Sequence, residues 1–288
     1  MKILLALLVL LGSLASGWAA TTIDANNAYA YSANAGWMNA YADCTNGAVL
    51  GQWYCTGYIY SANVGWICLG NGPTNGCAYS NTSGNDWGVN NIGGGQLSGL
   101  AYGANIGWIE FEQTYGMPQV NLLNGQLSGC AYSANCGWIS LSNTVAVLQT
   151  DSLSPGPLDG NGSGLPIAWE MQYCGGTNIN PNADPTGKGM SILQDYLAGT
   201  DPNNSNSVLR LTSLKANPQG TVATSTWTSV SSRFYYIVER TNLLAGAWTT
   251  NALGMVCPDA GPTTTRALTD SAASSRYFRV QAVIPLSP

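Results

Sequence analysis

A short motif recurs four times in the first half of this 288-residue chain, and it constrains the fold more than any other feature. Its first copy reads Tyr31-Ser-Ala-Asn34-Ala-Gly36-Trp37, and the tryptophan returns in the same context at positions 66, 108 and 138. Repetition of this kind indicates internal duplication, so the four units share one local structure. We therefore expect a repeat module over residues 21–150.

Each repeat unit has the pattern of a β-hairpin. An asparagine followed two residues later by glycine favours an Asx-turn and tolerates a positive φ, which reverses the chain. β-favouring runs such as Trp108-Ile-Glu-Phe111 flank the turn, and a further strand such as Gln119–Leu122 is expected beside some units. Strand alternation places Ile109 and Phe111 on one face. We expect this face to be the core, together with Ile67, Leu69, Ile139 and Leu141.

The opposite face of each hairpin carries the repeated tryptophan, and two interpretations of it remain open. In the first, each ring packs on the turn of its own or a neighbouring unit and seals a solenoid-like or prism-like stack. In the second, the rings stack on sugars while amides bond hydroxyl groups. The residues of this glycan-binding alternative are Trp37, Trp66, Trp108, Trp138, Asn34, Asn63, Asn105 and Asn135.

Charge and composition exclude several classes of function. Only 8% of residues are charged, against about 25% in an average domain. The chain has no histidine, which rules out Ser-His-Asp triads and imidazole metal ligands. No lysine or arginine lies between residues 3 and 187, which argues against a nucleic-acid partner. Glu110 and Glu112 share one strand face without an evident partner, so we assign no catalytic residue and expect no enzyme.

The N-terminus indicates export. Residues 1–20 contain Lys2, an apolar run and then small residues, which is the order of a secretory signal peptide. No later segment is apolar enough to span a membrane, so we expect a secreted, extracellular or cell-surface protein. Eight cysteines fit an oxidising compartment. A metal–thiolate site is the rival interpretation, but the chain has no CxxC pair. Their spacing favours the pairs Cys44–Cys55, Cys68–Cys77, Cys130–Cys136 and Cys174–Cys257.

Residues 151–205 contain two patterns of calcium-binding loops. The first matches a twelve-residue EF-hand-type loop, with oxygen ligands at positions 1, 3, 5, 7 and 12. The ligands would come from Asp159, Asn161, Ser163, the Leu165 carbonyl and Glu170. The second is degenerate, because Lys188 stands where an oxygen ligand belongs; its remaining positions are Asp184, Thr186, Met190 and Asp195. We expect one weak Ca²⁺ site and a doubtful second, with an ion-free polar turn as the alternative.

This segment resembles the dockerin and thrombospondin type 3-like calcium-loop segments of secreted multidomain proteins. The likeness covers about fifty residues and rests on Gly164-Leu-Pro-Ile-Ala-Trp169-Glu170 and on the run from Gly187 to Asp201. It implies short loop-helix units, stabilised by Ca²⁺, that act as spacers or docking modules. The departures at Thr186 and Lys188 place the second ion in doubt.

Residues 206–288 alternate polar and apolar in short strands. The expected strands are Val208–Leu214, Val222–Ser229, Phe234–Arg240 and Tyr277–Val283. Turn residues separate them, which indicates an antiparallel β-sandwich. Trp227-Thr-Ser-Val, Tyr236-Ile-Val-Glu-Arg and Tyr277-Phe-Arg-Val loosely resemble fibronectin type III-like domains of secreted bacterial proteins.

The sequence therefore predicts a mainly β protein, with a four-unit β-hairpin module, a short loop-helix calcium-type segment and a C-terminal sandwich. The expected function is non-catalytic, with a structural, adhesive or assembly role and a cell-surface protein, matrix protein or glycan as partner. Glycan binding is one alternative. The other is a fibre or sheath subunit, because neutral β-repeats can self-assemble edge to edge.

Overall fold

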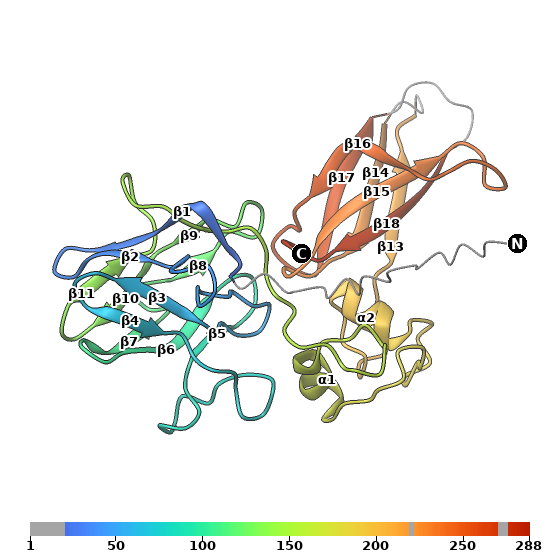
Figure 1. Cartoon of the computed structure of the whole chain (residues 1–288). Coiled ribbons are helices and arrows are strands. Elements are labelled where there is room, and N and C mark those ends of the chain that lie inside the picture. The colour runs from blue at the N-terminus through green and yellow to red at the C-terminus, as the bar shows by residue number, and fades with distance from the viewer. Residues whose placement is uncertain (1–20, 219–221, 270–275) are drawn as a thin grey trace, which may run out of the picture.

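The computed structural model describes residues 21–218, 222–269 and 276–288, so the predicted signal peptide lies outside the described residues. The protein is mainly β. Figure 1 shows an N-terminal β-barrel, two short helices after it, and a group of C-terminal strands on the far side of the helices.

The barrel part contains the strands of the four repeats and several short additions. The repeat strands are β1 (Ile23–Ser32), β2 (Gly36–Asn39), β3 (Tyr58–Ser61), β4 (Gly65–Cys68), β6 (Leu97–Gly103), β7 (Gly107–Phe111), β10 (Cys130–Ser133) and β11 (Gly137–Ser140). The additions are β5 (Val89–Asn91), β8 (Gln119–Val120), β9 (Leu127–Ser128) and β12 (Leu148–Thr150). The expected strand at Gln119–Leu122 is therefore present as the shorter β8, which pairs with β9.

Each copy of the motif contributes one antiparallel hairpin, and the hairpins join in chain order as β1-β2-β3-β4-β6-β7-β10-β11. The last strand then pairs with the first, where Tyr31 lies opposite Ser140 and Ser32 opposite Ile139. The sheet thereby closes into an eight-stranded antiparallel barrel. A solenoid-like stack is thus wrong, because pairing between the first and last repeats removes the free edges that a solenoid has.

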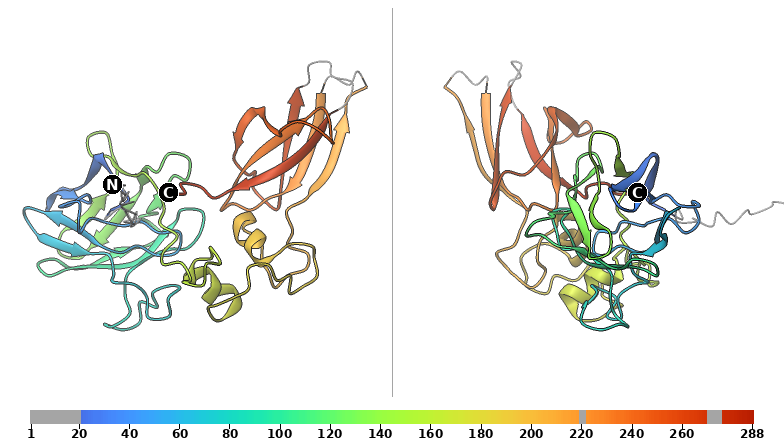
Figure 2. Two further views of the ribbon diagram at one scale, coloured as in Figure 1. Left: turned by 45° about the vertical axis from the view of Figure 1, so that its right-hand side comes forward. Right: turned by 90° about the vertical axis from the view of Figure 1, so that its left-hand side faces the viewer.

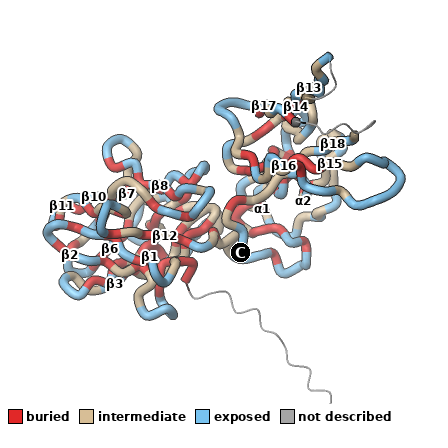
Figure 3. The backbone as a smooth tube through the Cα atoms, turned by 90° about the horizontal axis from the view of Figure 1, so that it is seen from above, coloured by how far each residue is buried: buried red, intermediate tan, exposed pale blue. Residues whose placement is uncertain are grey.

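The barrel interior is filled by the face that the sequence analysis assigned to the core. Ile67, Ile109 and Ile139 are each at most 4% exposed, and Figure 3 shows buried and exposed positions alternating along the strands. In three hairpins an alanine on the first strand lies opposite a larger residue on the second, as with Ala101 and Ile109. Small side chains facing large ones suit the narrow interior of an eight-stranded barrel.

The two helices follow two loops of similar construction. Helix α1 (Ile167–Cys174) begins after Pro166, and α2 (Ile192–Ala198) begins after Ser191, whose side chain accepts a hydrogen bond from the Gln194 backbone. Both helices end at a glycine in the left-handed conformation, which is the usual C-terminal stop. Together they pack a small core made of Leu165, Trp169, Ile192 and Tyr196.

The C-terminal strands form two three-stranded antiparallel sheets. One contains β13 (Leu211–Ala216), β14 (Val222–Thr228) and β17 (Thr263–Thr269), and the other contains β15 (Phe234–Arg240), β16 (Thr249–Val256) and β18 (Tyr277–Val283). One core cluster takes Trp227 and Leu268 from the first sheet and Tyr235, Ile237 and Val256 from the second. Strands β16 and β17 were not predicted from the sequence, because their threonine, asparagine and glycine residues mask any clear alternation.

The end of the chain returns to the barrel, as the left view of Figure 2 shows. The Leu153 backbone N–H donates to the Leu286 carbonyl at 2.7 Å, and the Leu286 side chain packs against the barrel core. Ile284 packs against the core of the two helices. Neither described helix has the length and hydropathy needed to cross a membrane.

All eight cysteines are free thiols, so none of the four predicted disulfides is present. Cys130 begins β10 at the open end of its hairpin, whereas Cys136 lies in the turn. At about 3.3 Å per residue this separation exceeds the roughly 7 Å that a disulfide can bridge. Cys55 is buried in the barrel core and Cys44 is exposed. Short spacing in the sequence was misleading, because an extended strand can place two cysteines that are close in sequence beyond the distance of a disulfide.

Candidate functional site

A belt of exposed aromatic side chains surrounds the barrel. Its members, which we call the aromatic belt, are Tyr31, Trp37, Tyr60, Trp66, Tyr102, Trp108, Tyr132 and Trp138. The four tryptophans are 43–48% exposed, and the tyrosines are 37–42% exposed. Strand alternation explains the arrangement, because residues that flank the inward alanines and isoleucines must point outward. The tryptophans predicted from the sequence are thus brought to one surface and remain open to solvent.

Each tryptophan has the tyrosine of its own hairpin directly opposite it on the neighbouring strand, as Trp66 has Tyr60. Within the four pairs, ring centroids lie 4.9–5.2 Å apart, with the planes strongly tilted. Aromatic pairs in this geometry are mutually attractive and fix one another's orientation. The belt is therefore a preorganised surface rather than a set of freely rotating rings.

The four turn asparagines of the glycan-binding alternative hydrogen-bond neighbouring turns to one another at one end of the barrel. The Nδ2 atom of Asn63 donates to the Ala35 carbonyl of the preceding turn at 3.1 Å, and Asn105 and Asn135 repeat this bond with the turns before them. Asn34 donates to the Cys136 carbonyl at 3.2 Å and so completes a ring of hydrogen bonds. These amide nitrogens are engaged within the protein, and the candidate binding surface consists of the rings.

Glycine in the turns makes this ring possible. Gly36 has a φ of 75°, which L-residues with a side chain rarely adopt. A Cβ atom there would lie 2.8 Å from Nδ2 of Asn63. Gly36 is therefore required both by the turn and by the close approach of Asn63, whereas Gly65, Gly107 and Gly137 are required by their positive φ.

The first loop brings two carboxylates together. Glu170 is fully buried and Asp159 is 9% exposed. Burial raises the pKa of Glu170 above its ordinary value, and the negative charge of Asp159 beside it acts in the same direction. Oε1 of Glu170 accepts a bond from the Ile179 backbone at 3.3 Å, whereas Oε2 is buried without a hydrogen-bond partner. Such an arrangement is costly unless a cation joins it.

The remaining predicted ligands of this loop lie in consecutive side-chain turns. Asp159 accepts from the Asn161 backbone, Asn161 from Ser163, and Ser163 from Leu165. The Leu165 carbonyl accepts from the backbone N–H of Asp159. The donor set of two carboxylates and neutral oxygens fits a hard cation such as Ca²⁺. Among the described residues no group of three or more His, Cys, Asp or Glu side chains forms a metal site, so neutral oxygens would have to complete the shell.

In the second loop, the side chain of Lys188 provides a positive charge. The Lys188 ammonium lies 2.9 Å from Oδ1 of Asp195, and both side chains are buried. It also donates to the carbonyls of Asp201, Asn204 and Ser207. Asp184 accepts bonds from the backbone of Lys188 and Gly189. The doubtful second site at Asp184, Thr186, Met190 and Asp195 stays a prediction, and the Lys188 ammonium occupies the position beside Asp195 that an ion would take.

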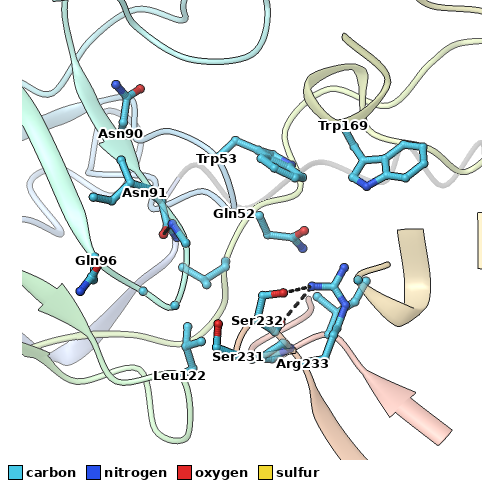
Figure 4. Close-up of a pocket in the computed structure, with 18 of the residues that line it drawn as sticks. Gln52, Trp53, Asn90, Asn91, Gln96, Leu122, Trp169, Ser231, Ser232 and Arg233 are labelled. Carbon is cyan, nitrogen blue, oxygen red and sulfur yellow. Dashed lines mark hydrogen bonds between the residues drawn. The ribbon is translucent and has the colours of Figure 1, made fainter. Parts of the chain in front are cut away.

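A cavity of about 900 Å³ lies where the barrel, the helices and the C-terminal sheets meet. Figure 4 shows Gln52 and Trp53 on the barrel side of this cavity and Arg233 opposite them. The guanidinium of Arg233 donates to the carbonyls of Tyr196 and Leu197, and so caps the end of α2. None of the described residues that line the cavity is acidic, so the lining provides no carboxylate pair for acid–base chemistry.

The two barrel glutamates, Glu110 and Glu112, lie close in sequence but differ in their hydrogen bonds. Glu112 follows the end of β7, and its carboxylate accepts backbone N–H groups of Thr114, Tyr115 and Gly116. Glu110 lies on β7 and is exposed. Glu112 therefore stabilises a turn, and the predicted shared strand face is wrong because β7 ends at Phe111.

Trp87 is a neighbour of the belt that was not predicted from the sequence. Trp87 precedes β5, and its ring centroid lies 5.2 Å from that of Trp108 and 6.1 Å from that of Tyr102. It lies in the long stretch between Trp66 and Trp108, outside the repeated motif, so no repeat signal identifies it. Comparisons with family models, curated proteins and solved structures found no match to this chain.

Proposed function

We propose that this chain is a non-catalytic secreted or cell-surface protein with an adhesive role, in which the aromatic belt binds the partner. The observation that carries the proposal is the exposure of the four tryptophans, each over 40%. Rings that only sealed the fold would be buried, because a tryptophan side chain contributes most when its surface leaves water. A partner that covers part of the belt would gain this burial.

Glycan binding is the form of adhesion that the belt favours most. The rings are flat and held in fixed orientations, and no lysine or arginine occurs between residues 3 and 187. Such a surface suits the apolar faces of sugar rings better than a charged protein patch. A fibre or sheath subunit is the weaker alternative, because the eight barrel strands have no free edges to pair with another copy.

The remaining parts fit a role as spacer and support. We interpret the loop-helix segment, residues 151–205, as a dockerin-like or thrombospondin type 3-like unit whose first loop binds Ca²⁺ through Asp159 and Glu170. We interpret the two C-terminal sheets, residues 206–288, as a fibronectin type III-like β-sandwich. The shared core of the two sheets supports the latter, and the unpartnered Oε2 of Glu170 supports the former.

Replacement of belt tryptophans tests the proposal. We expect W66A and W138A each to weaken binding to a glycan ligand about five- to tenfold, because one aromatic contact contributes ~1 kcal/mol beyond area burial. The measurement is quenching of tryptophan fluorescence after a screen on an array of oligosaccharides and immobilised matrix proteins.

The matched control is Y115A, since Tyr115 is 80% exposed but lies outside the belt. Circular dichroism and thermal melting would check that all variants fold. If the variant lacking all four belt tryptophans bound every responding ligand as the wild type does, the belt would not be the adhesive surface. A response to matrix proteins alone would remove the glycan form of the proposal.

A further inference from the structure

The aromatic belt differs from hairpin to hairpin, and the third hairpin differs most. In the first two hairpins a second tyrosine packs beside the tryptophan: Tyr29 beside Trp37, and Tyr58 beside Trp66. In the third, Leu100 takes this position on the strand, and Trp87 packs on Trp108 from outside the barrel. The third hairpin therefore presents two indole rings and the Tyr102 ring together.

A second difference lies at the seams between hairpins. The residue two positions after each tryptophan lies opposite the tyrosine of the next hairpin. The four seam residues are Asn39 opposite Tyr60, Cys68 opposite Tyr102, Glu110 opposite Tyr132, and Ser140 opposite Tyr31. Each belt tyrosine thus has an invariant tryptophan on one side and a chemically different residue on the other.

Three of the seam residues are engaged in their own loops. Asn39 accepts the backbone N–H groups of Tyr41 and Ala42. Cys68 accepts a bond from the Gly70 backbone, and Ser140 donates to the Ser142 carbonyl. Glu110 makes no comparable contact among the described residues, so its carboxylate is available to a ligand.

Glu110 also stands apart from the other carboxylates of the barrel. Asp24, Asp43, Asp86 and Glu112 each accept backbone N–H groups of their own loops. Within the described ranges, the ion pairs all lie at or beyond residue 188. The charge of Glu110 is therefore neither paired nor used to shape a turn, and it lies at a seam of the aromatic belt.

We propose that Glu110, which lies opposite Tyr132 and two residues from Trp108 on β7, is a subsite for an ammonium group carried by a glycan, that is, for an amino sugar without its acetyl group. The inference rests on the proposed function, because it assumes that the belt binds glycans. A sugar ring stacked on the exposed Trp108 indole would place its ammonium on the outer face of β7, where the Glu110 carboxylate also lies. Ring faces attract cations as well, and the region lacks any cation that would repel one.

The charge preference gives a sharp test. The probes are a glucosamine oligomer and the N-acetylglucosamine oligomer of the same length, titrated at pH 6 and low salt against wild type, E110Q and S140A. We expect wild type to bind the glucosamine oligomer three- to tenfold more tightly, since an exposed ion pair and a cation–π contact are each weak. E110Q should lose this preference and keep its affinity for the acetylated oligomer.

The serine variant is the matched control, because Ser140 occupies the equivalent seam and should leave the preference intact. Raising the salt concentration should reduce the preference in wild type, since salt screens exposed charges. Equal binding of the two oligomers by wild type, or an unchanged preference in E110Q, would overturn the inference while leaving the belt as the binding surface. Loss of all tryptophan-dependent glycan binding would instead remove the proposed function.

A third probe tests whether the ammonium group belongs to a glycan or to a protein. A short neutral peptide with a single lysine should bind more weakly than the glucosamine oligomer, because it has no sugar ring to stack on Trp108. If the peptide bound more tightly, and did so through Glu110, the ligand would be a protein and the glycan inference would be wrong.

Discussion

Lys188 shows how one residue changes the requirements of a loop. Its ammonium has four oxygen neighbours, one carboxylate and three carbonyls, so it has the surroundings of a small bound cation. The carbonyls belong to the connector that leads into the C-terminal sheets. The second loop therefore has a covalently attached positive charge at its centre.

We expect K188M to destabilise the segment by about 3–5 kcal/mol, because the buried Asp195 carboxylate loses its counter-charge. Chemical denaturation in the presence of a chelator, followed by tryptophan fluorescence, would measure the change. The double variant K188M/D195N should recover part of the loss, since it removes the unpaired charge. A K188M protein as stable as the wild type would show that the ion pair does not hold the loop.

The sequence indicated that Lys188 spoils a metal site, and Asp184 and Asp195 in the same loop are its evident candidates for an ion pair. It did not indicate the three carbonyl partners, which lie 13–19 positions further along the chain. Backbone carbonyls are present at every residue, so their position carries no sequence signal. The charge partner was predictable and the neutral partners were not.

At the scale of elements, the sequence predicted a mainly β protein, but it did not predict the closure of the sheet into a barrel. The motif marks each turn, and alternation correctly placed Ile109, Phe111 and their equivalents inside. Closure depends on the pairing of Tyr31 with Ser140, and nothing local to either strand distinguishes it from an open edge. The tryptophan face remained undecided for the same reason, since outward residues are exposed on a barrel and can be covered in a stack.

We expect N34A to destabilise the barrel by about 1 kcal/mol, as much as N63A, because each removes one amide-to-carbonyl bond of the same ring. The comparison tests closure, since the Asn34 bond joins the first repeat to the last. Thermal melting of the two variants provides the measurement, and hydrogen exchange of β1 and β11 amides provides a second. Faster exchange in these two strands than in β3 and β4 would contradict a closed barrel.

At the scale of the whole molecule, the Asp159–Glu170 loop lies between the barrel and the C-terminal sheets, so its stability affects how the parts are held. We expect 10 mM Ca²⁺ to stabilise the wild type by about 1.4 kcal/mol relative to a chelator, if the site has the millimolar affinity of extracellular loops. Thermal melting with and without calcium would measure it. The same melting temperature in both conditions would mean that the loop is an ion-free turn.

The pH dependence of this effect has a definite sign. Without a cation, the raised pKa of Glu170 means that the folded state holds the proton more tightly than the unfolded state. The contribution of Glu170 to stability is then present below its ordinary pKa and is lost as the pH rises through the raised value. In the presence of a chelator, we therefore expect the stability of E170Q relative to the wild type to increase between pH 4 and pH 7. With calcium at pH 7, the wild type should be the more stable of the two.

The arrangement of the three parts was beyond prediction because it depends on a few distant contacts. Leu286, near the end of the chain, packs on the barrel core, and Arg233 of the C-terminal part caps α2. Patterns within the sequence describe each part alone and give no sign of a contact between parts. Arg233 is 7% exposed, and it holds two parts of the molecule together.

Closure of the barrel has a consequence for valency. Four aromatic pairs distributed around a closed cylinder face in different directions, so a flat surface can engage only one or two of them at a time. A flexible polymer can wrap around the barrel and gain avidity from several weak contacts. Separate polymer strands can instead be cross-linked by one molecule, which would make this small protein a junction in a network.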